Sequence, residues 1–227
     1  MSSIIEISDL RKSYPSEQGR LEVLKGVNLS VDRPQSVSIM GRSGGGKSTL
    51  VALLSGLDRK DSGVVKVLQK DLSLFSSNQL IEYRAKNIGV IFQQFHLLPH
   101  LTALENVEMA LAFQGVDGAR DLAEKALADV GIDQRANHFP HQLSRGECQR
   151  VAIARVLVLS PKVVIADEPT GSLDVQTGER IMELLLNLVQ QRDMVLVLVT
   201  HDPELAARCD RQFILEGGTL TLSSHEV

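Results

Sequence analysis

The sequence has 227 residues, of which 43% are hydrophobic and 23% charged, an ordinary composition for a globular chain with a buried core. A formal net charge of −4 excludes the strongly basic surface of a nucleic-acid-binding domain. The start of the chain becomes polar too soon for a signal peptide, and no apolar run reaches membrane-spanning length. The two cysteines, Cys148 and Cys209, lack the spacing of a metal or redox site.

Short strands and helices are predicted for the first part of the chain. Alternating apolar and polar residues predict a strand over residues 4–7, a loop containing Tyr14, and one or two strands over 21–31. The segments that follow are a buried strand over 36–40, a helix over 48–57, a turn at 61–63, a strand over 64–68, a short helix over 79–86 and a buried strand over 88–92.

Residues 94–160 have a helical pattern. Helical spacing covers 104–113 and 120–130, and Ser144 begins a third helix that runs to about residue 159. Ser144 and Glu147 also have the spacing of a capping box. We interpret 94–160 as a helical subdomain inserted into one domain, 1–227, whose α/β core comprises 1–93 and 161–227.

The α/β pattern returns after residue 160. The predicted elements are a strand over 163–167, a helix over 175–191, a strand over 194–200, a short helix over 205–207, and a hairpin of 211–215 and 219–222 around Gly217 and Gly218. Near-continuous apolar strands such as 194–200 are typical of parallel sheets that are covered on both faces.

A glycine-rich loop between the strand at 36–40 and the next helix carries the first chemical signal. It fits G-x-x-x-x-G-K-[ST], and its residues are Gly41, Arg42, Ser43, Gly44, Gly45, Gly46, Lys47, Ser48 and Thr49. Glycines let backbone amides converge on an anion, so we expect the loop to hold the α- and β-phosphates of a nucleotide. Lys47 can reach the β- and γ-phosphates, and the Ser48 hydroxyl can ligate Mg²⁺. The alternative is a glycine-rich surface turn, which the strand–loop–helix order disfavours.

Two carboxylates follow the apolar residues of the strand at 163–167. We expect Asp167 and Glu168 at the carboxyl edge of the sheet, where open α/β sheets bind ligands. Asp167 would hold Mg²⁺ beside Ser48, and Glu168 would orient or deprotonate an attacking water. The alternative is an acidic pair at the surface or at a helix start.

Further motifs give the chain a family resemblance. They are Leu143-Ser144-Arg145-Gly146-Glu147-Cys148-Gln149-Arg150, close to L-S-G-G-[QE]-x-Q-R, with Phe92-Gln93, Asp167-Glu168-Pro169-Thr170, Ser172-Leu173-Asp174 and Thr200-His201-Asp202. In this order they resemble the ATP-binding subunits of ABC transporters over essentially the whole chain. Segments 92–99, 101–107 and 167–174 look most like the branch of lipoprotein-releasing and macrolide-exporter-type ATPases. The resemblance implies a P-loop, RecA-like α/β core with an antiparallel β subdomain and an inserted α-helical subdomain.

The resemblance also implies roles for single residues. Tyr14 would stack on adenine, with a half-buried loop tyrosine as the alternative. Gln93 would sense Mg²⁺ and the attacking water and link the site to a membrane partner. His201 would contact the γ-phosphate and position the water with Glu168. Glu147 and Asp174 are candidates for nucleotide binding because they lie within the matching motifs.

A dimer is the third implication of the resemblance. Ser144 and the Gly146 amide, at a helix N-terminus, would bind the γ-phosphate held by a second copy, so that two copies enclose two ATP molecules about a two-fold axis. ATP and Mg²⁺ are the implied cofactors. A separate transmembrane permease subunit is the implied partner, docked on the helical subdomain, with the chain at the cytoplasmic face of the inner membrane and no role for nucleic acid.

Arg145 departs from the family pattern, which has glycine at this place. A bulky cation beside the γ-phosphate site would either hinder closure or add an electrostatic contact. Other functions stay open: a motor that acts on external enzymes without transport, a module that binds ATP and dimerises with weak turnover, and an unrelated P-loop kinase or GTPase. The sequence contains no N-K-x-D motif, which argues against a GTPase.

Overall fold

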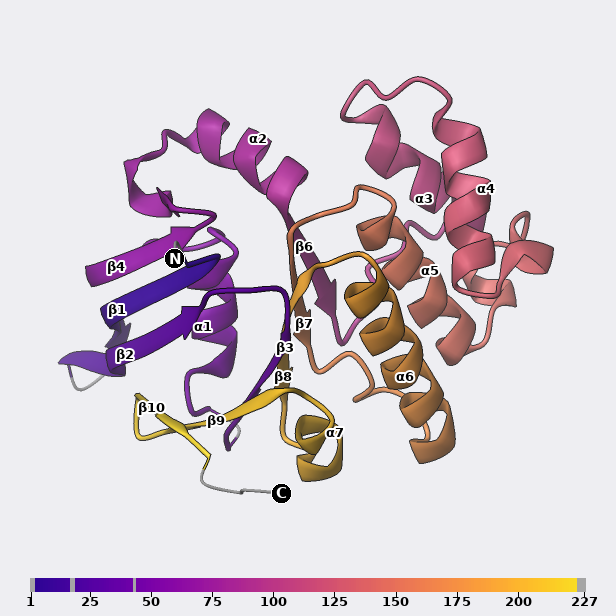
Figure 1. Ribbon diagram of the computed structural model, residues 1–227. Helices are drawn as coiled ribbons and strands as arrows, with labels where there is room; N and C mark the ends of the chain where they lie inside the picture. The colour runs from indigo at the N-terminus through magenta and orange to yellow at the C-terminus, as the bar shows by residue number, and fades with distance from the viewer. Residues whose placement is uncertain (1–2, 17–18, 43, 224–227) are drawn as a thin grey trace.

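The computed structural model describes residues 3–16, 19–42 and 44–223 and arranges them as two β-sheets with helices between and around them (Figure 1). This architecture is that of a P-loop NTPase core with an added antiparallel sheet and helices, as the sequence predicted. Ser43 of the glycine-rich loop lies outside the described residues.

The four-stranded sheet is antiparallel and has the order β2-β1-β4-β5. Its strands are β1 Ile5–Ser16, β2 Gly19–Val31, β4 Ser62–Val67 and β5 Lys70–Asp71. Two local predictions are wrong. Tyr14 lies in β1, where it pairs with Leu21, and residues 62–63 begin β4 instead of forming a turn. In both cases the strand is extended by pairing with a neighbouring strand. A local sequence pattern carries no information about such pairing.

The six-stranded sheet has the order β10-β9-β3-β8-β7-β6 and is parallel except at β10. Its strands are β3 Ser36–Met40, β6 Ile88–Phe92, β7 Val163–Asp167, β8 Val195–Thr200, β9 Arg211–Glu216 and β10 Thr219–Leu222. Successive residues of a strand face opposite sides, so Val163 and Ile165 join one core while Val164 and Ala166 join the other. Because both faces of β7 and β8 are buried, these two strands are almost entirely apolar, whereas β9 and β10 carry polar residues.

Helix α1, Lys47–Leu54, lies between the two sheets (Figure 1). One buried cluster joins this helix to both sheets, and it includes Leu50 and Leu54 of α1, Ile5 of β1 and Ile39 of β3. The burial of β3 and α1 on either side of the glycine-rich loop fixes the ends of that loop. The sequence predicted this strand–loop–helix unit correctly.

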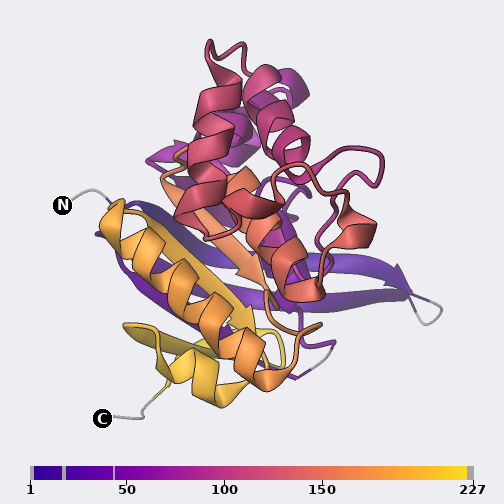
Figure 2. The ribbon, with the colours of Figure 1, turned by 90° about the vertical axis from the view of Figure 1, so that its right-hand side faces the viewer.

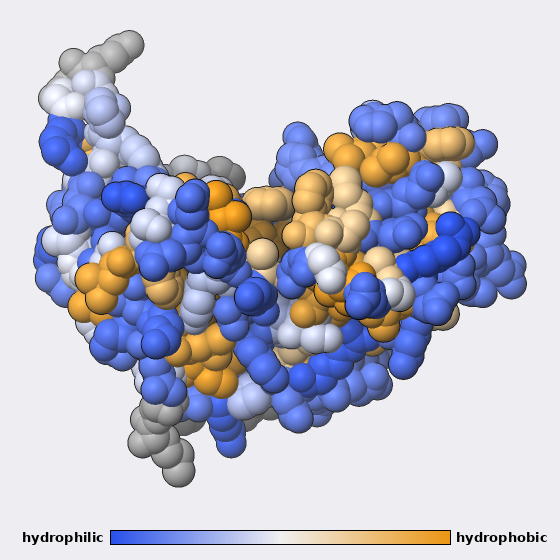
Figure 3. Space-filling view, turned by 90° about the horizontal axis from the view of Figure 1, so that it is seen from above, coloured by the Kyte–Doolittle hydropathy of each residue, from blue (hydrophilic) through white to orange (hydrophobic). Residues whose placement is uncertain are grey.

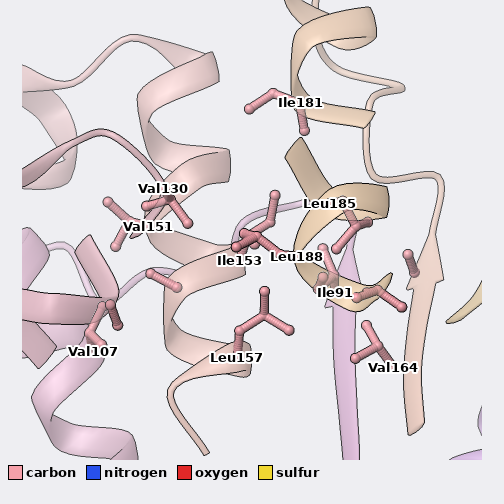
Figure 4. Close-up of a cluster of buried hydrophobic side chains, with 14 of the residues drawn as sticks. Ile91, Val107, Val130, Val151, Ile153, Leu157, Val164, Ile181, Leu185 and Leu188 are labelled. Atoms are coloured by element: carbon pink, nitrogen blue, oxygen red, sulfur yellow. The ribbon is translucent and has the colours of Figure 1, made fainter. Parts of the chain in front are cut away.

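The opposite face of the six-stranded sheet is covered by α5 Arg145–Leu157, α6 Val175–Gln191 and α7 Pro203–Ala207 (Figure 2). A second buried cluster holds them there. Figure 4 shows side chains of α5, α6 and the sheet meeting in it, among them Ile153, Leu157, Ile181, Leu185 and Ile91. Both predicted long helices, from Ser144 and from residue 175, are confirmed.

The remaining helices are α2 Ser77–Asn87, α3 Ala103–Ala112 and α4 Ala119–Asp129, with 3₁₀ turns at Leu72–Leu74, Asp133–Arg135 and Pro140–Gln142. Capping boxes begin α2, α3 and α5. Helices α3 and α4 pack together beside α5 (Figures 1 and 2). Within the described residues, no helix combines the length and apolarity that crossing a membrane requires.

Candidate active site

The glycine-rich loop joins the end of β3 to the start of α1. At Gly46, the N-cap of α1, the backbone is left-handed with φ 97°, a conformation that favours glycine. A Cβ at Gly41 would lie 2.4 Å from the carbonyl oxygen of Leu215 in β9, so only glycine fits there. The loop is therefore held tightly against the sheet, with the first backbone N–H groups of α1 free of intrahelical partners.

Lys47 is the first residue of α1 and is largely buried. Its Nζ donates hydrogen bonds to the carbonyl oxygens of Gly41 at 2.7 Å and Arg42 at 3.2 Å. The ammonium group thus lies over the loop, beside the amides that an anion would contact. The loop combines a positive charge with a helix N-terminus, which is the arrangement that binds phosphate.

A cavity of about 510 Å³ opens at the loop. It lies at the carboxyl ends of the parallel strands, where open α/β sheets bind ligands. The residues that line it are Val23, Gly44, Gly46, Lys47, Ser48, Thr49, Gln93, Asp167, Glu168 and His201. The structure therefore brings together the loop, the two carboxylates, Gln93 and His201, which lie far apart in the sequence. Val23 of β2 lines the same cavity, and no motif indicated it.

Asp167 ends β7, between Phe92 of β6 and Val199 of β8. Burial raises the pKa of this carboxyl group, and the neighbouring carboxylate of Glu168 raises it further, while Lys47 acts in the opposite direction. A half-buried carboxylate and the Ser48 hydroxyl in one cavity are oxygen donors that suit Mg²⁺. Among the described residues no cluster of three or more His, Cys, Asp or Glu could hold a metal by itself, so any Mg²⁺ would need further ligands from phosphate or water.

Glu168 adopts a left-handed backbone with φ 49°, which is uncommon for a residue other than glycine. Its amide donates a hydrogen bond to the carbonyl oxygen of Val199 at 2.9 Å. Its Oε1 lies 2.8 Å from Nδ1 of His201, and the carboxylate side chain is 17% exposed while the imidazole is 69% exposed. This pair places a sheltered carboxylate next to a group that is open to the cavity, as a water-activating site requires.

Gln93 follows β6 and is exposed on the cavity wall. Its Nε2 lies 2.8 Å from the position that a Cβ would take at Gly171. Its carbonyl oxygen accepts a hydrogen bond from the Ser172 hydroxyl at 3.4 Å. Gln93 therefore contacts both the cavity and segment 171–174, the loop that precedes α6.

Tyr14 lies on β1, outside the set of residues that line the cavity. Its hydroxyl donates to Asp58 at 2.7 Å, and the ammonium of Lys12 lies 4.9 Å from the ring centroid. Burial raises the pKa of Tyr14, as does the bond to Asp58, while a contact with Thr49 of α1 lowers it. The ring is fixed beside α1 by Asp58, a residue that the sequence did not single out. Stacking on adenine remains a prediction.

The residues of segment 143–150 lie apart from the cavity lining. Ser144 is the N-cap of α5, and its hydroxyl accepts from the Glu147 amide at 3.3 Å. The carboxylate of Glu147 accepts a hydrogen bond from the Ser144 amide at 2.7 Å and forms an ion pair with Arg135 at 3.2 Å. The hydrogen bond from the Ser144 amide lowers the pKa of Glu147. Gly146 is buried, and a Cβ there would lie 2.6 Å from Cγ2 of Thr177.

Asp174 is the N-cap of α6 and accepts a hydrogen bond from the amide of Thr177 at 3.0 Å, which lowers the pKa of Asp174. The structure thus accounts for Glu147 and Asp174 as capping residues, and their contact with nucleotide stays a prediction. Apart from Tyr14, the predicted site residues in the described part of the chain form two groups, one at the glycine-rich loop and its cavity and one at the starts of α5 and α6.

Comparisons with known proteins identify the family of the chain. The family model described as "ABC transporter" matches residues 24–171. The lipoprotein-releasing system ATP-binding protein LolD of Geobacter metallireducens is 45% identical over 96% of this chain and 98% of its own length. The macrolide export ATP-binding/permease protein MacB of Shigella flexneri is 40% identical over 97% of this chain, but the chain spans only 34% of that relative.

A solved structure of the ATP-binding cassette MJ0796, described as a dimer in a post-hydrolysis state bound to ADP and Pi, is 37% identical. It superposes with a TM-score of 0.89 and covers 98% of this chain and 99% of its own. Nearly the whole length of the chain thus has the fold of a known ATP-binding cassette. The chain belongs to the ABC transporter family as one of its ATP-binding subunits.

Proposed function

We propose that the chain is the ATP-hydrolysing motor subunit of a membrane ABC transporter of the export or lipoprotein-release type. The observation that carries this proposal is the cavity in which Lys47, Ser48, Asp167, Glu168 and His201 meet. These residues supply a phosphate-binding cation, two oxygen donors for a metal and a group that can activate water. The LolD and MacB relatives support the type of system.

Phosphate binding follows from the loop geometry. Lys47 would exchange its bonds with the carbonyl oxygens of Gly41 and Arg42 for bonds with the β- and γ-phosphates. The N–H groups at the start of α1 would donate to the same phosphates. Ser48, Asp167 and Gln93 would hold Mg²⁺, which when bound neutralises the charge that develops on the transferred phosphoryl group.

Glu168 and His201 are the residues that we assign to water activation. The carboxylate of Glu168 would accept a proton from, or orient, the water that attacks the γ-phosphate. His201 keeps that carboxylate in place through its Nδ1 and leaves the rest of the ring exposed toward the cavity. Glu168 also has a left-handed backbone, and such strained conformations concentrate at functional sites, which supports a functional role for this residue.

The second group of residues supports a composite site. Ser144 and the amide of Gly146 lie at the N-terminus of α5, an anion-binding position that no phosphate held in the chain's own cavity would occupy. We place them against the γ-phosphate bound by a second copy, in a two-fold dimer with an ATP at each of its two equivalent sites. The dimeric MJ0796 cassettes support this arrangement.

An apolar groove supports docking of a permease helix. It has a volume of about 390 Å³ and lies between α2, β6, α3 and α5, on the side that carries apolar surface around a hollow in Figure 3. Leu57 and Ile81 in it are 50% and 59% exposed. The MacB relative, named as an ATP-binding/permease protein, extends well beyond the part that this chain matches. That relative supports a permease as the partner, so we infer that the occupant is a cytoplasmic helix of a permease, which would hold the chain at the membrane surface.

Arg84 indicates which kind of side chain the docking helix should carry. It lines the groove, its pKa is lowered by burial alone, and no ion pair joins it to the described residues. Arg155 in the same groove instead donates to the carbonyl oxygens of His96 and Phe95. A half-buried cation favours a carboxylate on the docking helix. Each variant is produced in cells in place of the wild-type protein, and the membrane fraction is assayed for the chain. We expect Arg84→Glu to be lost from the membrane fraction and Arg120→Glu to remain in it. Equal membrane binding of both variants would contradict docking at the groove.

The hydrolysis proposal is tested with Glu168→Gln, which keeps the shape of the side chain but cannot accept the proton. We expect kcat to fall by about 100-fold or more, with ATP binding and ATP-induced dimers retained. The control is Glu216→Gln at an exposed carboxylate outside the cavity. Wild-type protein that forms ATP-dependent dimers without hydrolysis would instead favour a nucleotide-dependent interaction module.

A further inference from the structure

Arg145 makes a contact that the glycine of the family pattern cannot make. It is the first residue of α5 and is exposed. Its Nη1 donates a hydrogen bond to the carbonyl oxygen of Ser172 at 3.1 Å. The guanidinium therefore lies along the surface of its own chain, toward the loop before α6.

Ser172 connects this contact to the cavity. Its hydroxyl donates to the carbonyl oxygen of Gln93 at 3.4 Å while its own carbonyl oxygen accepts from Arg145. Gln93 lines the phosphate cavity. One residue thus joins the cavity wall to the start of α5 through two hydrogen bonds.

The surroundings show that few other polar contacts hold the start of α5 to the core. Gly146 packs against Thr177 of α6 so closely that no Cβ fits between them. One turn further along α5, Gln149 is fully buried, and its amide atoms have no hydrogen-bond partner in the described part of the chain. Gln149 therefore does not fix the helix by a polar contact, and among the described residues the hydrogen bond from Arg145 to Ser172 is the one that joins α5 to segment 171–174.

We propose that Arg145 is a positioning residue, which ties the start of α5 to segment 171–174 and so moves the Ser144–Gly146 anion site together with the Gln93 side of the cavity. The effect of this link on ATP hydrolysis rests on the proposed function. A change at the phosphates would shift Gln93, Ser172 and the start of α5 as one body, and the shift would reach the site that this chain offers to its second copy. An arginine at this position thus connects α5 to segment 171–174 by a hydrogen bond, whereas a glycine has no side chain to make one.

Distance measurements test the link directly. Spin labels go on Lys125→Cys of α4 and Asn187→Cys of α6, both exposed positions. The natural thiols are buried, and burial raises the pKa of Cys148 and raises that of Cys209 to about 12, so labelling of the unmodified chain is expected to be negligible. The variants are Arg145→Met, Arg145→Gly and Arg145→Lys, with Arg120→Met on the same subdomain as the matched control.

Without nucleotide, we expect a broader distance distribution in Arg145→Met and Arg145→Gly, partial recovery in Arg145→Lys, and the wild-type distribution in Arg120→Met. Distributions that are the same in all variants would overturn the proposal. This measurement needs no hydrolysis, so its failure is distinguishable from failure of the proposed function. Thermal unfolding of each variant confirms that it is folded.

Kinetics separate a positioning role from direct contact with phosphate. Loss of the link should lower kcat by about fivefold, a change of the size that one typical hydrogen bond contributes, with KM for ATP unchanged. Arg145→Lys should recover part of kcat. A rise in KM with unchanged kcat would overturn the proposal in favour of contact between Arg145 and the nucleotide of the second copy.

Discussion

At the scale of single residues, the site combines groups whose surroundings work against stability. Asp167 is a half-buried carboxylate next to a second carboxylate, and Glu168 has a left-handed backbone that costs about 1–3 kcal/mol in a residue other than glycine. A hydrogen bond from the amide of Glu168 to the carbonyl oxygen of Val199 and the contact of its Oε1 with Nδ1 of His201 hold this geometry. Such unfavourable groups concentrate where charge and water must be positioned for chemistry.

Asp167→Asn should stabilise the nucleotide-free protein near neutral pH. The folded-state pKa of Asp167 lies above its ordinary value because of burial and then Glu168, so the folded state holds a proton that the unfolded chain has released. The stability from this group is complete below the ordinary carboxyl pKa and is lost as pH rises through the raised pKa. The variant cannot ionise, so its melting temperature should exceed that of wild type at high pH, and the gap should close on acidification.

Thermal unfolding from about pH 4 to about pH 8, without nucleotide, checks this prediction. A gap that is constant over this range, or that widens on acidification, would contradict it. Added MgATP should reverse the order at neutral pH, because Asp167→Asn lacks the carboxylate that would hold the metal.

At the scale of elements, much of the structure could be predicted because it rests on local patterns. The helices from Ser144 and from residue 175 carry capping residues followed by apolar spacing, and the apolar strands at 88–92 and 163–167 are buried on both faces. Strand pairing was predicted less well: β1 extends through Tyr14 because it pairs with β2 there.

The part of the candidate site that could be predicted is the part whose motifs directly follow strands of the parallel sheet. The phosphate loop and Asp167 meet because parallel strands share a carboxyl edge. The bond from Arg145 to Ser172 joins residues 27 positions apart, and Asp58 reaches Tyr14 across 44 positions. These contacts depend on how two elements pack, so no local spacing indicates them.

The junction of α5 and α6 gives a prediction at this scale. Gly146→Ala should destabilise the fold by about 1–3 kcal/mol, because its Cβ would lie 2.6 Å from Cγ2 of Thr177, although alanine is otherwise the better helix former. Thr177→Ser removes that methyl group, so the double variant should be more stable than Gly146→Ala alone. Denaturant unfolding of the two single variants and the double variant measures this coupling. Additive effects would show that the two helices are not in close contact here.

At the scale of the whole molecule, the two groups of site residues have different locations. Lys47, Asp167 and Glu168 line the cavity at the sheet edge, whereas Ser144 and Gly146 lie at the start of α5, outside that lining. A single chain therefore holds half of each proposed site, and only a two-fold pair would complete both. In such a pair, ATP stabilises the closed state through contacts that hydrolysis removes.

Complementation between two inactive variants tests this composite site most directly. Lys47→Met disables the phosphate loop, and Ser144→Phe disables the start of α5; each is expected to lose ATP hydrolysis alone. In a mixed dimer, the intact loop of one copy meets the intact Ser144 of the other, so equal mixing should restore about a quarter of the wild-type rate. Folded variants that bind to each other and yet restore no hydrolysis would contradict a site shared between two copies.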